Sequence, residues 1–375
     1  MIATLADLGY FIFGLYSLLL ILSGTPLNLL CFYIFKRVIP NRSNATIIVF
    51  SYLALIELLI PFTWNLNYTI RELVWKRQTN STIKNLEEHS LFVCKLVSFS
   101  AYFLLQCAAW LKTLATFARC VSVHNEWTIR KYILNSRAIH RLCWMTIILI
   151  GIMNFPIWIV NGKEAFSIDK NNKTQKQIMC YRSVFFKYWE IVHLLLYNFI
   201  PFTFMILCNI AIIRHVRESR RRTQRSKMRS ASIVKSPSTL SSNRRSLATS
   251  DGRLTKTLIF ITIFFIICTS PSAIFYISLG KIIKRHRHLI TMGLSNLATT
   301  SHVSSFIIYW LTSSDFKNAV ISFLYCRAPV SQGPSAEDKL QHSRYSTRAV
   351  STSMRASSSD LQRKLPTLYL SPSID

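Results

Sequence analysis

The chain has 375 residues, of which 50% are hydrophobic and only 16% are charged, and it contains 24 phenylalanines. This composition is typical of a membrane protein rather than of two or three soluble domains. The formal net charge is +29, but much of it lies in residues 214–256, where thirteen lysines and arginines face two acids. Retention of that segment in the cytosol explains the charge without a nucleic-acid partner.

Long apolar runs alternate with short polar stretches along the chain. A bilayer requires about 20 apolar residues per spanning helix, and backbone groups that face lipid must bond within their own segment, so each run predicts a helix. The predicted spans are 10–35, 45–70, 94–122, 141–161, 186–213, 255–280 and 289–311. The predicted fold class is therefore an all-α integral membrane protein, a seven-transmembrane helix bundle.

Charges beside the first span predict the orientation. Asp7 precedes this span, whereas Lys36, Arg37 and Arg42 follow it. The positive-inside rule then places residues 1–9 outside and the first loop in the cytosol. The basic loop at Lys281–His288 falls outside in this topology, where it either attracts an acidic ligand or glycan or is simply solvated.

Two segments rich in serine and arginine are expected to be disordered and cytoplasmic. They are the third inner loop, residues 214–254, and the tail, residues 327–375, which leaves 10–326 as the membrane domain. Both offer sites for kinases, and the tail for arrestin, although a plain solubilising linker explains them equally well. Residues 315–325 predict a short amphipathic eighth helix on the membrane lipid, followed by Cys326 as a palmitoylation site.

Nine cysteines are present, but the topology places only Cys94 and Cys180 in or next to an oxidising environment. These two are expected to form a disulfide. Asn80 and Asn172 begin glycosylation sequons in predicted outer loops, in agreement with the orientation. No catalytic, metal or cofactor site is predicted, because the sequence shows neither nucleophile–base nor metal-ligand spacing.

The third span ends in a charged residue. From Cys94 to Arg119 there are 25 residues, or about 37 Å of helix, which is enough to cross the bilayer. Small residues recur with Arg119 at alternating steps of four and three, which predicts one closely packed face. That face comprises Ala101, Leu105, Ala108, Lys112, Ala115 and Arg119.

One residue or short motif in each span, together with the cysteine pair, forms an ordered set. Its members are Asn28 after Gly24, Leu53-Ala54-Leu55-Ile56-Glu57, Phe117-Ala118-Arg119-Cys120, Trp144, Pro201, Cys268-Thr269-Ser270-Pro271 and Ser305-Phe306-Ile307-Ile308-Tyr309. With these marks, residues 10–326 resemble the rhodopsin-like (class A) G-protein-coupled receptors. The chain departs from the family pattern where Glu57 replaces an aspartate, Ala118 replaces an acid, and the sixth-span motif lacks its tryptophan.

The resemblance implies that an outside ligand rearranges spans five to seven and lets Arg119 engage a heterotrimeric G protein. It also implies roles in activation for Asn28, Pro271 and Tyr309. In the family, the acid before the arginine helps to hold the resting state. Ala118 removes it, which predicts basal signalling or altered coupling. Unchanged ligand-independent signalling in Ala118→Asp would contradict this hypothesis.

Glu57 and Lys112 lie deep within the second and third spans. An unpaired charge at such depth costs several kcal/mol or more. One hypothesis is an ion pair between them, which would replace the sodium site that many relatives build from the second-span acid. The alternative is that internal water solvates each group or that each is neutralised.

The ligand is expected to be a neuropeptide. Ala101 stands where receptors for biogenic amines carry an aspartate, and Asn209 after Pro201, the run 268–273 and the ending Phe-Ile-Ile-Tyr resemble invertebrate neuropeptide receptors. The predicted pocket residues are polar or aromatic: Tyr68, Tyr102, Gln106, Asn154, His193, Tyr197, Tyr276 and Ser295. A chemosensory receptor for a small molecule is the nearest alternative. A transporter or channel is a further alternative, and an enzyme is disfavoured.

Overall fold

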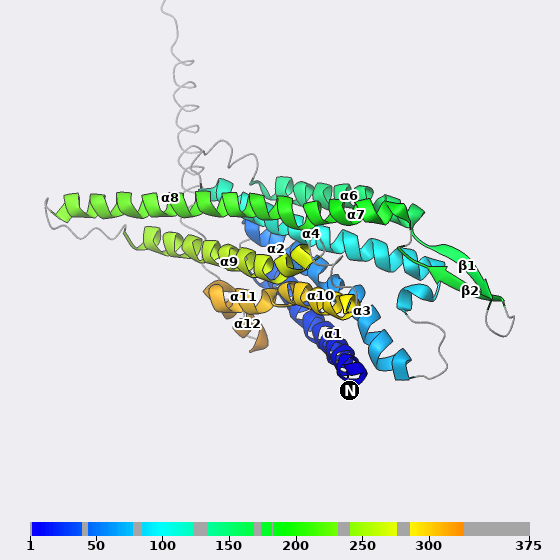
Figure 1. The fold of residues 1–375 in the computed structure, drawn as a ribbon. Helices are drawn as coiled ribbons and strands as arrows, with labels where there is room; N and C mark the ends of the chain where they lie inside the picture. The colour runs from blue at the N-terminus through cyan, green and yellow to red at the C-terminus, as the bar shows by residue number, and fades with distance from the viewer. Residues whose placement is uncertain are drawn as a thin grey trace, which may run out of the picture. The chain divides into compact units, whose positions relative to one another are not determined.

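The computed structural model describes residues 2–39, 44–77, 85–123, 134–168, 174–181, 183–231, 241–275 and 286–325. These residues are almost entirely helical (Figure 1). The predictions for Asn80, Asn172, Tyr276, Cys326 and the tail 327–375 lie outside them.

Seven helical rods cross the described part of the bundle, and several consist of more than one element. In chain order the elements are α1 (Ile2–Tyr33) with η1 (Ile34–Val38); α2 (Ala45–Leu59), η2 (Ile60–Phe62), α3 (Trp64–Thr69), η3 (Ile70–Val74) and η4 (Trp75–Arg77); η5 (Leu86–Glu88); α4 (Leu91–Val123); α6 (Ser136–Val160); α7 (Val184–Leu194), η6 (Leu195–Phe199) and α8 (Ile200–Ala231); α9 (Ser241–Ile274); α10 (Arg287–Val303) and α11 (Ser305–Thr312); and α12 (Ser314–Leu324). An antiparallel hairpin of β1 (Lys163–Ile168) and β2 (Thr174–Met179) follows α6, with Lys163 opposite Met179.

Six rods are long and apolar enough to cross a membrane: Leu5–Val38, Ala45–Val74, Leu91–Val123, Ser136–Val160, Val184–Ser219 and Leu254–Ile274. The seventh, α10 with α11, is shorter in each part and carries buried polar groups such as Asn296 and His302. Large apolar side chains, among them Leu22, Ile152 and Ile267, are more than half exposed on the outside of the rods. Such a surface suits lipid rather than water.

Three rods are interrupted where the sequence predicted continuous spans. Pro61 lies in the 3-10 turn between α2 and α3. Proline has no backbone N–H to donate, so the regular α-helical hydrogen bonding is interrupted there. The π-helical turn Leu195–Phe199 similarly precedes Pro201. At Ser304 there is no proline; instead the hydroxyl of Ser304 bonds the carbonyl of Thr300 at 2.7 Å, beside the break between α10 and α11.

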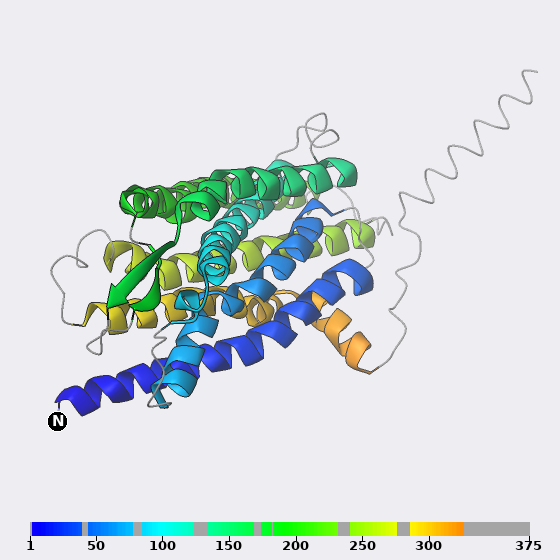
Figure 2. The ribbon, with the colours of Figure 1, turned by 90° about the vertical axis from the view of Figure 1, so that its right-hand side faces the viewer.

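Helix α4 is the centre of the bundle, and it packs against α2, α6, α8 and α9 (Figures 1 and 2). The predicted closely packed face is confirmed, because its alanines, Ala101, Ala108 and Ala115, are all 0% exposed. Phe117, on another face, is half-exposed. Small side chains thus allow the neighbouring helices to approach the side of α4 that carries Lys112 and Arg119.

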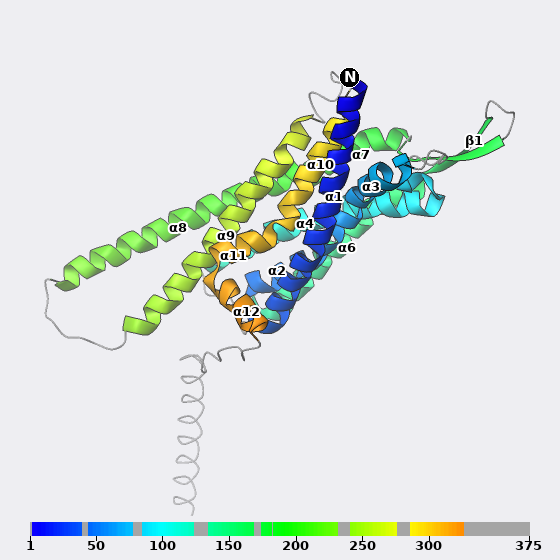
Figure 3. The ribbon, with the colours of Figure 1, turned by 90° about the horizontal axis from the view of Figure 1, so that it is seen from below.

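The predicted short helix after the seventh rod is α12, which turns away from α11 at Ser313 (Figure 3). The Ser313 hydroxyl accepts a hydrogen bond from the backbone N–H of Phe316 at 3.3 Å and so caps the helix. Phe316 and Val320 are buried against the bundle, while Leu324 is exposed. This division gives α12 the expected amphipathic character.

The inner loop predicted as disordered is partly helical. Helix α8 continues to Ala231 and α9 begins at Ser241, so both extend into the segment 214–254. Arginine, lysine and glutamine are good helix formers, and a helix that is already nucleated in the membrane propagates readily into such a sequence. Composition therefore underestimated helix at the two ends of this segment.

Candidate functional site

A disulfide joins Cys94 on α4 to Cys180 after β2, with a Cα–Cα distance of 6.1 Å. The predicted pairing is confirmed. It fastens the hairpin segment to the start of α4, and the next residue, Tyr181, lines a cavity. We call this end of the bundle the disulfide end and the opposite one the Arg119 end.

A cavity of about 570 Å³ opens at the disulfide end. Of the residues predicted for the ligand pocket, the five that line it are Tyr68, Tyr102, His193, Tyr197 and Ser295. Its other walls carry asparagines, threonines, two acids, Trp64 and Tyr181, together with three basic side chains, Arg71, Arg287 and His288. The cavity therefore combines hydrogen-bonding groups with aromatic faces, as ligand sites do.

Gln106 and Asn154 do not line the cavity, contrary to the prediction for them. The Asn154 amide donates to Gln106 Oε1 at 2.6 Å, and Gln106 Nε2 lies 3.1 Å from His193 Nδ1. Gln106 lies one helical turn below Tyr102, about 6 Å deeper in the bundle, where α6 closes over it. These side chains support the cavity floor by holding the ring of His193.

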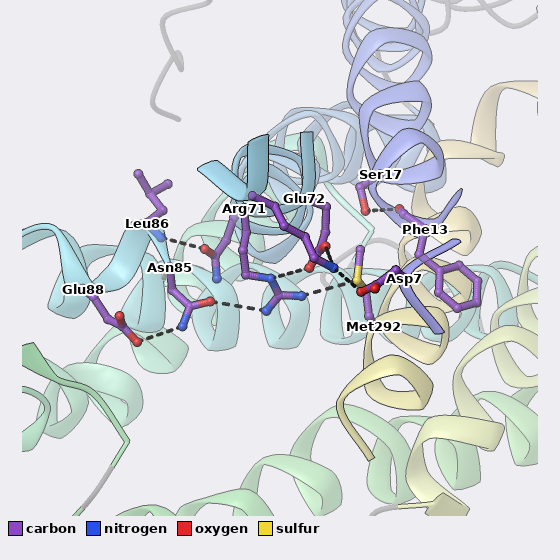
Figure 4. A network of polar contacts seen from close by, with 11 residues as sticks. Asp7, Phe13, Ser17, Arg71, Glu72, Asn85, Leu86, Glu88 and Met292 are labelled. Atoms are coloured by element: carbon purple, nitrogen blue, oxygen red, sulfur yellow. Dashed lines mark hydrogen bonds and ion pairs between the residues drawn. The ribbon is translucent and has the colours of Figure 1, made fainter. Parts of the chain in front are cut away.

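A polar network fixes the wall formed by η3 and the segment before α4 (Figure 4). The Arg71 guanidinium contacts Glu72 Oε1 at 2.7 Å and donates to Asn85 Oδ1 at 3.3 Å. Lys76 bridges Glu72 at 3.3 Å and Asp7 at 3.0 Å. The network connects α1, η3 and the residues before η5, so it holds the shape of this wall.

Glu87 is a site residue that the sequence reasoning missed. It lines the cavity, and its Oε1 accepts a hydrogen bond from the Tyr181 hydroxyl at 3.1 Å. Burial raises the pKa of this carboxyl to about 7, although the Tyr181 bond opposes the rise. No sequence pattern pointed to it, because Glu87 lies in η5, a three-residue 3-10 helix whose placement depends on tertiary contacts.

The ion pair predicted between Glu57 and Lys112 is present, with Lys112 Nζ 2.9 Å from Glu57 Oε1. The side chains are 1% and 2% exposed. The ammonium also lies 4.3 Å from the ring centroid of Phe265 on α9, which adds a cation–π contact. A low-polarity interior strengthens this attraction, while it makes either charge costly alone.

His302 on α10 completes the ion pair and was not predicted. Its Nδ1 lies 3.1 Å from Lys112 Nζ and 3.2 Å from Glu57 Oε1. Its Nε2 lies 3.1 Å from the Tyr197 hydroxyl. Because a neutral imidazole carries one proton, acceptance from Lys112 makes Nε2 the donor to Tyr197, whereas donation to Glu57 makes Nε2 the acceptor. The tautomer of His302 thus determines the direction of the Tyr197 hydrogen bond.

Tyr197 connects the cavity with the buried charges. It lines the cavity, and its ring stacks on that of His193 with centroids 5.3 Å apart. A ligand that shifts Tyr197 therefore acts on a hydrogen bond to the charged cluster, which we define as Glu57, Lys112 and His302. Through this cluster and Tyr197, four rods meet within hydrogen-bonding distance.

Asn28 and Tyr309 lie near the cluster and were predicted to take part in activation. The Asn28 amide donates to the carbonyl oxygen of His302 at 3.5 Å, which ties α1 to α10. Tyr309 lies on the side of the Arg119 end, among the rings of Phe35, Phe50 and Phe316. Pro271 lies inside α9, three residues before its last residue, Ile274. None of these contacts by itself assigns a role.

Arg119 is bonded to the sixth rod. Its Nε donates to the Thr255 hydroxyl on α9 at 3.2 Å, and its Nη1 donates to Ser122 at 3.3 Å. Ala118, beside it, offers no acid. A threonine across the helix interface therefore holds the guanidinium here, and this contact was not predicted. Among the described residues, no group of three histidines, cysteines or acids is placed to bind a metal ion.

The family model of the 7 transmembrane receptor (rhodopsin family) matches residues 28–315, more than three quarters of the chain. No curated protein matches the sequence. With its helical bundle and the Cys94–Cys180 disulfide, the chain belongs to the rhodopsin family of seven-transmembrane receptors. It is thus a multi-pass membrane receptor and not an enzyme.

Proposed function

We propose that this receptor binds a peptide at the disulfide end, outside the cell, and activates a heterotrimeric G protein at the Arg119 end. One observation carries the proposal. Tyr197 lines the cavity and hydrogen-bonds to His302, which contacts both members of the buried ion pair. Ligand contact at the cavity thereby reaches the rods on which Arg119 and Thr255 lie.

The same features support the proposed orientation. Disulfides persist in oxidising environments, so the Cys94–Cys180 end is assigned to the outside. Asp7 belongs to this end through its ion pair with Lys76, and the basic helix ends around Arg217 and Arg222 belong to the other. Labelling of a tag before Asp7 on intact cells tests this orientation.

A peptide suits the wall composition. Asparagine and threonine side chains supply donors and acceptors for main-chain amides, and Trp64, Tyr68 and Tyr102 supply faces for apolar side chains. The β1–β2 hairpin leads directly to Tyr181 in the cavity wall and offers strand edges to an extended chain. A small molecule is the second candidate, because about 570 Å³ is also a common volume for small-molecule pockets.

The experiment is a peptide-library screen on cells that express the full chain with a promiscuous G protein. Arg119→Ala is the paired control, with its surface amount measured by labelling. The proposal predicts a peptide that triggers nucleotide exchange in the wild type but not in the variant at equal surface amount. Responses to small molecules alone would favour the second candidate. An equal response in Arg119→Ala would contradict the proposed coupling.

A further inference from the structure

Glu87 differs from the other acids near the cavity in being buried without a matching cation. It is 7% exposed and lines the cavity. Among the described residues, no basic group lies within 4.0 Å of its carboxylate, and its bonded partner is the neutral Tyr181 hydroxyl. Burying a carboxylate with a single neutral hydrogen-bond partner costs free energy. Such groups are characteristic of binding sites.

The groups that face Glu87 do not neutralise it. Arg71 faces it from η3, but this guanidinium is engaged by Glu72 at 2.7 Å. Glu88, on the same short helix, adds negative charge. The Cys94–Cys180 disulfide lies against the Glu87 main chain, with Cys180 Sγ 3.5 Å from its carbonyl oxygen. The local field at the carboxylate therefore favours a cation.

The main chain around Glu87 is held firmly. The backbone N–H of Leu86 donates to Asn67 Oδ1 at 2.9 Å, and Asn85 bridges Arg71 and Glu88 at 3.3 and 2.9 Å (Figure 4). These contacts fix the carboxylate before a ligand arrives. A preorganised charge binds its partner with a smaller entropic cost.

We propose that Glu87 is the subsite of the cavity that receives a positively charged group of the ligand, an ammonium or a guanidinium. The rings of Trp64 and Tyr181 line the same cavity and give a cation further favourable surfaces. This subsite rests on the proposed function as a ligand receptor. The subsite specifies a positively charged ligand group. Glu87 would bind this group in place of the third-span aspartate of amine receptors, where this chain has Ala101.

The titration of the carboxylate supports the assignment. Burial raises its pKa to about 7, so the group is charged at pH 8 and mostly neutral at pH 6. Affinity for a cation is therefore expected to be full above pH 7 and to fall as the pH decreases through 7. The charged and titratable groups that face the Glu87 carboxyl are Arg71, Glu88 and Tyr181.

The test is affinity selection on the purified full chain in detergent. The mixture contains peptides and small organic amines, each in a free and an N-acetylated form, and selection is carried out at pH 8 and pH 6. Glu87→Gln keeps an acceptor for Tyr181 but removes the charge. Glu218→Gln is the matched control, because it makes the same change at an exposed acid on α8 that does not line the cavity.

We expect the wild type to retain cationic members at pH 8. Glu87→Gln is expected to weaken their binding at least tenfold, as loss of a charge-assisted hydrogen bond does, and Glu218→Gln to change it less than twofold. Retention of neutral or acidic members, or equal affinity in Glu87→Gln, would overturn the subsite. Retained ligands that fail to activate a G protein would contradict the proposed function alone.

Discussion

Two ion pairs among the described residues, one inside the bundle and one at its outer end, have different surroundings. Glu57 and Lys112 are 1% and 2% exposed in the middle of the bundle. Asp7 and Lys76, near the disulfide end, are 64% and 46% exposed at a similar distance of 3.0 Å. The two pairs have similar distances but contribute differently to stability. Water screens the charges of the outer pair, whereas each charge of the inner pair is stabilised mainly by the other.

The largest effect is expected from breaking the inner pair. Lys112→Met leaves the Glu57 carboxylate buried without its cation, which costs about 3–5 kcal/mol. Adding Glu57→Gln removes the stranded charge, so the double variant is expected to regain most of this loss. Thermal denaturation of the four proteins in detergent measures the coupling. A double variant that is as unstable as the sum of the two single variants would show that the pair does not act as a unit.

Glu87 is an intermediate case, buried like Glu57 but without an ion-pair partner among the described residues. Its pKa is raised to about 7 in the folded protein, so the folded state binds the proton more tightly and stability falls as the pH rises from about 4.5 to 7. Glu87→Gln is thus expected to stabilise the protein by on the order of 3 kcal/mol at pH 8 and by nothing near pH 4.5. Melting temperatures across this range test it, and a gain that is independent of pH would contradict it.

Arg119 provides a smaller effect, because its contact to Thr255 is a single hydrogen bond. Thr255→Val keeps the shape and removes the acceptor, which shifts the balance between resting and active bundles by about 1 kcal/mol, or roughly fivefold. We expect higher basal nucleotide exchange. Thr203→Val on α8 is the control, because the Thr203 hydroxyl donates to the carbonyl oxygen of Phe199 one turn earlier in the same rod. Unchanged basal exchange would mean that Thr255 does not hold Arg119 in the resting state.

The smallest effect is expected at the outer pair. Lys76→Gln removes two partly exposed ion pairs, which typically contribute about 0–1 kcal/mol in all. The loss should shrink further at high salt, because screening has already weakened the pairs. Thermal denaturation at low and high ionic strength measures this. A loss as large as that of Lys112→Met would contradict the comparison with the inner pair.

The sequence offered the inner pair as one of two hypotheses, because charge is costly in an apolar span; the structure decides for the pair over separate solvation or neutralisation. The sequence did not predict His302, whose partners are 190 and 245 residues away along the chain. A lone histidine in a polar span carries no comparable penalty. Periodicity shows which side chains share a face of one helix, but it does not show which faces of two helices meet.

The same limit explains the errors at the cavity. Tyr102 and Gln106 share a face of α4, and the sequence does not show that Asn154 on α6 bonds to Gln106. Glu87 lies in the short helix η5, which contacts Asn67 and the disulfide. The rods themselves were predicted from hydrophobicity, whereas the turn at Ser304 depends on hydroxyl groups that compete for the backbone.

The link between cavity and charged cluster rests on the hydroxyl of Tyr197. The most direct measurement compares peptide binding with nucleotide exchange in Tyr197→Phe, using an active peptide from the screen and Tyr68→Phe, another tyrosine of the cavity wall, as control. We predict that Tyr197→Phe keeps the affinity within about threefold but loses most of the stimulated exchange, a split that Tyr68→Phe does not show. Full stimulated exchange in Tyr197→Phe would contradict transmission through His302.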